Sequence, residues 1–261
     1  LFPNQHEWNP IMKLSQFIVL LALLVFWAIG DLCGMFNSDV IPPILDVGAA
    51  LGTVFQRTEF LPSLWLTLRD SLFSVIIATS LAIPLGLLIG MSSKIELSTR
   101  VLLDFGRTFP MIALIPIFIL LIGTNHIMKI VITSMACFFP ILVQTIYGAR
   151  RLDTTVEDTV TSFQIPAMMR FTRVVFPSAM PFIATGIRLS LSISILVAIA
   201  VEVFTQVPGI GSLIGLAQTY NETAVAFLYV IIAGLAGVSV TGLWDLLETR
   251  LLAWHHRGEK S

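Results

Sequence analysis

Residues 71–91 read SLFSVIIATSLAIPLGLLIGM, a run of 21 residues without a charged side chain. A helix needs roughly 20 apolar residues to cross the hydrocarbon core of a bilayer, so this run predicts a transmembrane helix. The whole chain of 261 residues agrees with this, because 56% of it is hydrophobic and only 12% is charged. A soluble domain carries about 25% charged residues, so the composition excludes a soluble enzyme.

Five further apolar runs flank this one and give a fold of six transmembrane helices in a single domain spanning residues 1–261. A cleaved signal peptide is the alternative for the first run, but no A-x-A cleavage site follows it. Several runs contain proline, which is typical of kinked helices packed against neighbours. The six spans are expected at about 14–35, 71–91, 101–123, 126–147, 177–204 and 226–247.

The distribution of Lys and Arg predicts the orientation, since cytoplasmic loops carry the excess of positive charge. With both termini in the cytoplasm, the opposite side holds only Arg57, Arg69 and Lys129. The segments then assigned to the cytoplasm contain Lys13, Lys94, Arg100, Arg150, Arg151, Arg170, Arg173, Arg250, Arg257 and Lys260.

Charge and metal-ligating residues exclude other classes of protein. The net charge is −1, so the chain lacks the excess of positive charge that is typical of proteins that bind nucleic acids. Cys33 and Cys137 lie in apolar stretches and are expected to be packing residues. No metal motif such as HExxH occurs, so no metal site is expected.

The stretch at 150–176, RRLDTTVEDTVTSFQIPAMMRFTRVVF, is too polar to span a membrane and too long for a simple turn. Asp153 or Thr154 is a candidate N-cap for a first short helix, and Ile165-Pro166 interrupts the chain before a second. Such a pair of helices serves either as an interfacial amphipathic anchor or as a docking surface for a cytoplasmic partner.

This stretch resembles the cytoplasmic EAA loop of permease subunits of ABC importers. Asp158 occupies the Glu position, Thr159 and Val160 the two Ala positions, and Gln164 the Gly position. The interval to the next span fits, although the identities differ from the pattern. Between about residues 40 and 250, the chain is similar to permeases for aliphatic sulfonates, taurine and nitrate. The segments that carry this similarity are IPLGLLIGMSSK (83–94), PMIALIPIFILLIG (110–123), FFPILVQTIYGARRLD (138–153), VVFPSAMPFIATGIRLSLSISI (174–195) and VPGIGSLI (207–214).

The resemblance implies an all-α membrane protein, the transmembrane domain of a type I ABC importer in a bacterial cytoplasmic (inner) membrane. It implies a second permease copy, two ATP-binding subunits and a periplasmic or lipid-anchored substrate-binding protein as partners. The chain has no G-x-x-x-x-G-K-[ST] motif, so no cofactor is expected on it, and ATP and Mg²⁺ belong to the partner subunit. By resemblance, the residues that couple the permease to the ATPase are Asp153, Glu157, Asp158, Thr159, Val160, Phe163, Gln164, Ile165, Pro166 and Arg170.

Polar residues within spans are candidates for the translocation path, because ionisable groups in a membrane usually face a cavity. Arg188, Ser192 and Glu202 share one helix face, but Arg188 and Glu202 are about 21 Å apart along the axis. Arg188 snorkelling to water, Ser194 bonding to its own backbone, and an Arg107–Asp104 pair are the structural alternatives. The candidates for the path are Arg188, Ser192, Ser194, Glu202 and Arg107.

The segment QVPGIGSLIGLAQTYN (206–221) resembles the periplasmic gate region of the family. Pro208, Gly209 and Gly211 are expected to shape its turn. The transported solute stays open between a sulfonate, taurine, nitrate or similar anion and an aromatic acid or vitamin precursor. A secondary transporter is the rival class, and it requires ionisable groups deep in several spans or inverted repeats.

Overall fold

The computed structural model describes residues 10–151 and 154–252, which form helices and connecting loops and contain no strand. A 3₁₀ turn at Met111–Leu114 precedes α5, and a π-helical turn at Phe171–Val175 joins α8 to α9. The helices are α1 Pro10–Leu32, α2 Ile44–Gln56, α3 Phe60–Gly90, α4 Ser93–Thr108, α5 Ile115–Ile122, α6 His126–Arg150, α7 Thr154–Ser162, α8 Ala167–Arg170, α9 Phe176–Thr205, α10 Ile210–Thr219 and α11 Thr223–Leu251.

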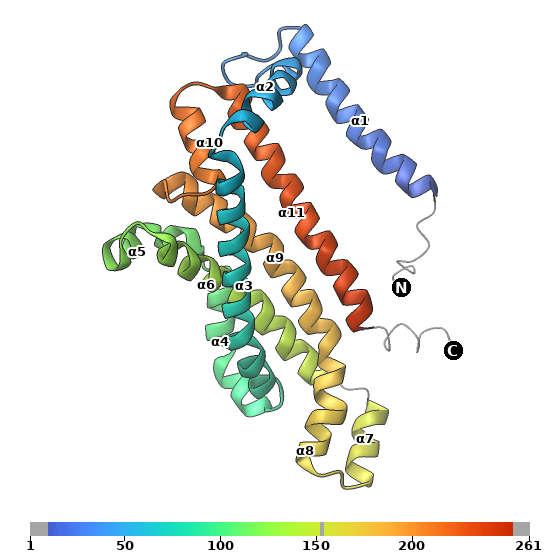
Figure 1. Cartoon of the computed structure of the whole chain (residues 1–261). Helices are drawn as coiled ribbons and strands as arrows, with labels where there is room; N and C mark the ends of the chain where they lie inside the picture. Colours follow the sequence, from blue (N-terminus) through green and yellow to red (C-terminus); the bar gives the residue numbers. More distant parts are fainter. Residues whose placement is uncertain (1–9, 152–153, 253–261) are drawn as a thin grey trace.

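Helices α3, α6 and α9 pack against one another and form the centre of the bundle (Figure 1). Small residues on α3 make this close packing possible. A Cβ atom on Gly86 would lie 2.6 Å from the Cβ of Thr145 on α6, and one on Gly90 would lie 2.7 Å from that of Ala149. The two glycines, four residues apart on α3, therefore bring α3 against α6.

Four helices within the described residues are long and apolar enough to cross a membrane: α3, α6, the continuous helix Ala167–Thr205 and α11. A fifth span results if α4 and the segment Met111–Ile122 are counted as one. Helix α1 is apolar over Phe17–Leu32, but this apolar part is shorter than that of the four candidate spans. The all-helical membrane fold is thus confirmed, while the count of six spans stays a prediction.

The third predicted span, 101–123, is wrong as a single helix. The structure has two pieces here, Ser93–Thr108 and Met111–Ile122, which are bent by 81°. Phe109 is extended, with φ −70° and ψ 127°, because the residue before a proline is disfavoured in the helical region. Pro110 also lacks the N–H group that would continue the helix. The break turns α5 away from the axis of α4.

The second predicted span begins too late. The mixed charges of residues 53–70 predict a segment at the outer interface, but α3 is continuous from Phe60 to Gly90. Asp70 lies inside this helix with 1% of its side chain exposed, because cationic groups of neighbouring residues surround it. Pairing with the buried Lys129 and the partly exposed Arg69 makes this charge in the helix tolerable.

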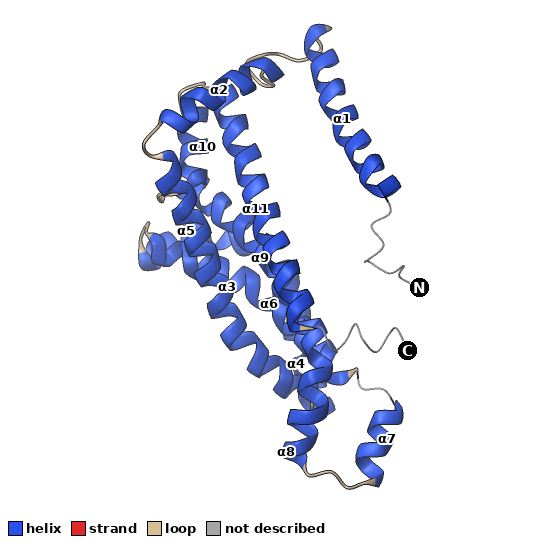
Figure 2. Cartoon of the chain, turned by 45° about the vertical axis from the view of Figure 1, so that its right-hand side comes forward, coloured by secondary structure: helices blue, strands red, loops and turns tan. Residues whose placement is uncertain are grey.

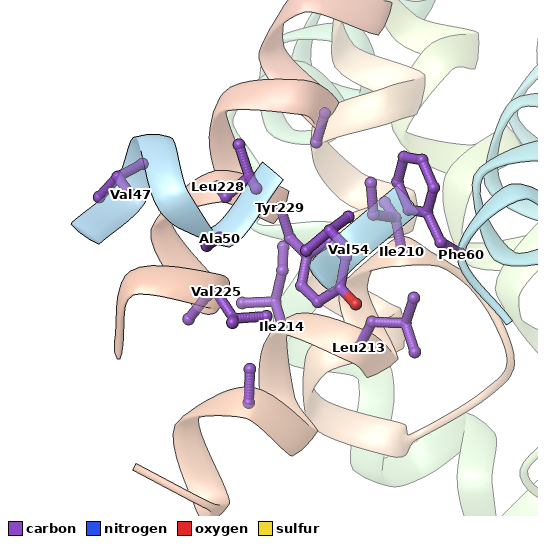
Figure 3. Packing of buried hydrophobic residues seen from close by; sticks show 13 residues of the cluster. Val47, Ala50, Val54, Phe60, Ile210, Leu213, Ile214, Val225, Leu228 and Tyr229 are labelled. Atoms are coloured by element: carbon purple, nitrogen blue, oxygen red, sulfur yellow. The ribbon is translucent and has the colours of Figure 1, made fainter. Parts of the chain in front are cut away.

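An apolar cluster joins α2, α3, α10 and α11 at one end of the bundle (Figure 3). Val54 of α2, Phe60 of α3 and Ile210 of α10 surround Tyr229 of α11, and the Phe60 and Tyr229 rings are stacked 6.0 Å apart. This cluster fixes the short helices α2 and α10 on the ends of the long ones. Helices α7 and α8 lie at the opposite end (Figure 1).

Helix α1 stands apart from the bundle in both overall views (Figures 1 and 2). It touches the rest through Trp27, whose Nε1 donates to Pro42 O at 3.1 Å and whose ring lies 6.0 Å from that of Phe227. Cys33 follows α1 and is exposed, which corrects the expectation that it packs in a core, whereas Cys137 is buried as expected.

Candidate functional site

A buried group of charges lies near the end of the bundle formed by α2 and α10. Lys129 of α6 lies with its Nζ 2.6 Å from Asp70 Oδ2 of α3 and 2.9 Å from Glu202 Oε1 of α9. The three side chains are 0%, 1% and 0% exposed, respectively. We call these three residues the ionic triad. It ties together the three central helices of the bundle.

The Glu202 carboxylate also faces the first turn of α10. The Gly211 N–H donates to Glu202 Oε2 at 2.9 Å, and the Thr67 hydroxyl donates to Glu202 Oε1 at 2.8 Å. Thr67 Oγ1 in turn accepts the N–H of Ile210 at 2.9 Å. The amino terminus of a helix favours negative charge, because its first backbone N–H groups have no partner within the helix. The Glu202 carboxylate therefore holds α10 in place by accepting from such an N–H group.

Asp70 has two further partners toward the rim of the bundle. Arg69 Nη2 lies 2.7 Å and His126 Nδ1 lies 2.8 Å from its two oxygens, and both partners are 37% exposed. Asp70 thus connects the fully buried Lys129 with side chains that reach the surface. Lys129 and Arg69 supply two positive charges against the two carboxylates of Asp70 and Glu202.

The three residues predicted for the outer gate lie directly on the triad. Pro208 O accepts a hydrogen bond from Lys129 Nζ at 3.3 Å. A Cβ atom on Gly209 would lie 2.1 Å from the carboxyl carbon of Glu202, and one on Gly211 would lie 2.4 Å from Ile199 O. Glycine is required here for space, and this brings the backbone close to the buried carboxylate. A gating role for this turn stays a prediction.

Arg188 lies elsewhere, between α9 and α11. Its Nε is 2.8 Å from Asp245 Oδ1 and its Nη2 is 2.5 Å from Glu248 Oε2. The Ser194 hydroxyl donates to Leu191 O at 2.8 Å within its own helix. The structure therefore does not bring Arg188 together with Glu202, and two acids on α11 neutralise Arg188.

Ser192 lines a separate apolar cavity of about 430 Å³ between α9 and α11. Arg107 forms the expected pair with Asp104, at 2.9 Å, and both side chains are half exposed. Arg107 also lines a groove along α4 and α6 together with Gln144. Of the five path candidates, only Arg107 lies in a groove lined by further arginines.

The polar stretch forms two helices at the far end of the bundle, as its sequence predicts. Helix α7 ends at Ser162, and Gln164 adopts a left-handed conformation with φ 48°. The N–H of Ile165 then donates to Val160 O at 3.1 Å, which closes the turn before Pro166 opens α8. Gln164 therefore stands at a position where the glycine of the family pattern has a conformational advantage.

The surface of this helix pair is mixed, and large apolar side chains are exposed among its polar residues. Phe163 is 77% exposed and Met168 is 75% exposed, whereas Val160 is buried. Thr159 bonds to the backbone of its own helix, Asp158 is exposed and Arg170 ends α8. Asp153 lies outside the described residues, as does the side chain of Glu157. The role of these residues in coupling stays a prediction.

Sequence reasoning missed Asp70, Lys129 and His126. Lys129 had been counted with the loops although it falls inside the predicted span 126–147. A lysine within a predicted span is itself a signal, because a charge there requires a partner or a cavity. Its partners Asp70 and Glu202 are 59 residues before it and 73 after it, so only the packing of the helices reveals the triad.

Residues 82–253 match the family described as the binding-protein-dependent transport system inner membrane component. Among curated proteins, the chain is 26% identical over 237 residues to the putative aliphatic sulfonates transport permease protein SsuC of Bacillus subtilis, covering 91% of this chain and 86% of the relative. It is 27% identical to the SsuC protein of Escherichia coli, with 94% and 93% covered. It is also 26% identical to the formylaminopyrimidine transport permease protein ThiX of Halalkalibacterium halodurans, with 94% and 97% covered.

Two solved structures have the same fold. A chain of an inward-facing MetNI methionine ABC transporter superposes with a TM-score of 0.60 at 16% identity, covering 76% of this chain and 96% of the other. A chain of an amino acid ABC transporter gives a TM-score of 0.62 at 17% identity, with 78% and 97% covered. At such identities, the likeness concerns the fold alone.

Proposed function

Because the chain belongs to the binding-protein-dependent transport system inner membrane component family, we propose that it is the ABC-importer permease that carries a small anion into the cell by alternating access. The transport path is built by this chain, and the energy comes from ATP hydrolysed on a separate subunit. The chain itself is not an enzyme in this proposal.

The observation that carries the proposal is the helix pair α7–α8. It lies at one end of the bundle and is joined without a flexible linker to α9, since Ala167–Thr205 is one continuous helix of 39 residues. A force applied to α8 is therefore transmitted along α9 to the ionic triad. The exposed Phe163 and Met168 supply an apolar contact for a groove on the partner.

The partners are part of the same proposal. We propose that two copies of the chain form one path and that each docks an ATP-binding subunit, which holds ATP and Mg²⁺. The α7–α8 end then lies in the cytoplasm together with both termini. The opposite end, with α2 and α10, faces a substrate-binding protein outside a bacterial cytoplasmic membrane.

The substrate class rests on the relatives. Two of them carry the name of an aliphatic sulfonate permease, which supports a small sulfonate or a related anion such as taurine or nitrate. Another relative is named as a formylaminopyrimidine permease, so a vitamin precursor or an aromatic acid is the alternative solute within the family.

A secondary transporter is the second candidate, and one observation favours it. The ionic triad with His126 places ionisable groups from three helices in contact, as an ion relay requires. The family assignment argues against a secondary transporter. A secondary transporter and an ABC importer differ in the energy source that drives uptake.

Co-purification tests the coupling contact. The chain is expressed with its ATP-binding subunit, and Phe163→Ser is compared with Leu235→Ser, which changes an exposed apolar residue in the middle of α11, away from both ends of the bundle. We expect Phe163→Ser, Asp158→Lys and bulky replacements of Gln164 to reduce recovery of the ATPase or its stimulation by substrate-loaded binding protein. Unchanged recovery and stimulation in all three would contradict the proposed docking surface.

A further inference from the structure

A groove runs along α4 and α6 and consists of two adjoining cavities. The wider has a volume of about 890 Å³ and the narrower about 370 Å³. They share Arg107, Val143 and Gln144, so Arg107 stands where the two halves meet. Volumes of this size are typical of sites for small molecules.

The wider half is basic. Two carboxylates lie in its wall, Glu96 and Asp104. Its arginines are Arg100, Arg107, Arg150 and Arg151. Four positive and two negative side chains leave an excess of two positive charges in this half of the groove.

The carboxylates do not reach all four arginines. Glu96 Oε2 lies 2.5 Å from Arg150 Nη1, and Asp104 pairs with Arg107 within α4. Among the described residues, no ion pair is formed by Arg100 or Arg151. The Arg151 guanidinium lies 5.9 Å from the centre of the Phe182 ring, which holds it toward the groove without neutralising it.

The narrower half is apolar except for Arg107 and Gln144. Phe109, Phe139 and Ile193 are among the residues of its wall. A ligand that fills the whole groove therefore needs a charged end and an apolar end. Planar guanidinium groups recognise oxyanions through paired hydrogen bonds, which suits a compact sulfonate-like head group.

We propose that this groove binds an organic anion, with its oxyanion head group at Arg107 and the basic half and its short apolar tail along Phe109 and Phe139. The inference rests on the proposed function for how the anion reaches the groove, and it selects an organic anion over an inorganic one. Affinity of this kind gives the permease its own selection step, in addition to that of the binding protein.

An anionic phospholipid offers the same chemistry, so the test separates the two sources. The full chain is placed in nanodiscs of phosphatidylcholine alone, and binding of hexane-1-sulfonate is measured by equilibrium dialysis, with empty discs as the blank. Inorganic sulfate and hexan-1-ol are the comparison probes. A second set of discs contains phosphatidylglycerol.

We expect hexane-1-sulfonate to bind at least about tenfold more tightly than either comparison probe. Arg107→Gln should weaken it by about tenfold or more, the fold-change of one charge-assisted hydrogen bond, and Arg107→Lys by less. Arg250→Gln, which removes an exposed arginine on α11 outside the groove, should leave binding unchanged.

Equal binding of sulfate and hexane-1-sulfonate, or no effect of Arg107→Gln in a chain that elutes as the wild type does, would overturn the inference. So would loss of hexane-1-sulfonate binding in the discs with phosphatidylglycerol, because the groove would then be a lipid site. Binding needs no ATPase. If the chain imports solute with ATP but does not bind hexane-1-sulfonate, this inference alone is refuted. If it binds hexane-1-sulfonate but does not import solute with ATP, the proposed function alone is refuted.

Discussion

Lys129 and Glu202 form an ion pair of 2.9 Å between α6 and α9, and neither side chain has any exposed surface. The same ammonium group also contacts Asp70 at 2.6 Å. Removing one partner from a buried group of charges costs about 3–5 kcal/mol, because the remaining charges lose their compensation. Lys129→Met should therefore lower the free energy of unfolding by that amount, measured as a fall in the thermal unfolding midpoint in detergent.

The matched control is Arg57→Gln, which removes a cation from an exposed pair with Glu222. Such a surface pair contributes about 0–1 kcal/mol. If Lys129→Met unfolds at the same temperature as Arg57→Gln, the triad does not stabilise the bundle.

Neutralising the whole triad should cost less than removing its cation. Asp70→Asn and Glu202→Gln combined with Lys129→Met leave no charge among the three buried positions, and Arg69, which loses its partner Asp70, is 37% exposed and reaches solvent. Replacing a buried group of charges in this way is often close to neutral in stability. We expect the triple variant to unfold at a higher temperature than Lys129→Met alone. A triple variant that is less stable by the sum of the single effects would show that the three residues act independently.

Gly209→Ala should destabilise the turn above the triad. The new Cβ would lie 2.1 Å from the Glu202 carboxyl carbon, which is held by Lys129, Thr67 and Gly211, so either the turn or the carboxylate has to move. Overpacking of this kind costs about 1–3 kcal/mol.

Gly52→Ala is the control for this change, because nothing lies within 4 Å of its added Cβ and it sits inside α2. Alanine in a helix is favoured over glycine by about 1 kcal/mol, so this variant should be as stable as the wild type or more so. Equal unfolding midpoints for Gly209→Ala and Gly52→Ala would contradict the close contact.

Arg188→Gln separates a structural role from a role in transport. Solvent screens the pair of Arg188 with Asp245, whose side chains are 38% and 53% exposed, but Glu248 is only 14% exposed and also loses its cation. The loss of both pairs should therefore cost about 1–3 kcal/mol. We expect solute uptake by the variant to match that of the wild type. A large fall in uptake at unchanged stability would restore Arg188 to the translocation path.

The two cysteines report on orientation. Cys33 is exposed next to the polar turn after α1, whereas Cys137 is buried and its Sγ donates to Ser190 O at 3.4 Å. With the termini in the cytoplasm, a membrane-impermeant maleimide should label intact cells that produce the wild type but not the Cys33→Ser variant. Labelling of Cys33 only after the cells are opened would reverse the orientation.

The sequence predicts those parts of the fold that depend on local pattern. The uncharged run at 71–91 marks a span, and Ile165-Pro166 marks the turn between α7 and α8. The bend of 81° near Pro110 was missed because two prolines in an apolar run are also compatible with a kinked span. The start of α3 at Phe60 was missed because Arg69 and Asp70 look like interfacial residues until their partners are known.

The candidate site is formed by contacts between residues that are far apart in the sequence, and no local sequence pattern predicts such contacts. Pro208, Gly209 and Gly211 were selected as a turn, but the reason for the two glycines is the buried Glu202 beneath them. Arg107 was a candidate on one helix, and its neighbours Arg150 and Arg151 belong to another. Segments far apart in the chain had to be packed before these groups met.

In the function that we propose, this chain carries solute with energy supplied through α7 and α8 by a separate ATPase. The most direct measurement is uptake of a radiolabelled alkanesulfonate into proteoliposomes that contain the chain and its ATP-binding subunit, with the binding protein outside. Uptake is predicted to require ATP inside the vesicles together with binding protein outside, and to be absent with a proton or sodium gradient alone. Uptake driven by such a gradient without ATP would show that the chain is a secondary transporter and not the permease of an ATP-driven importer.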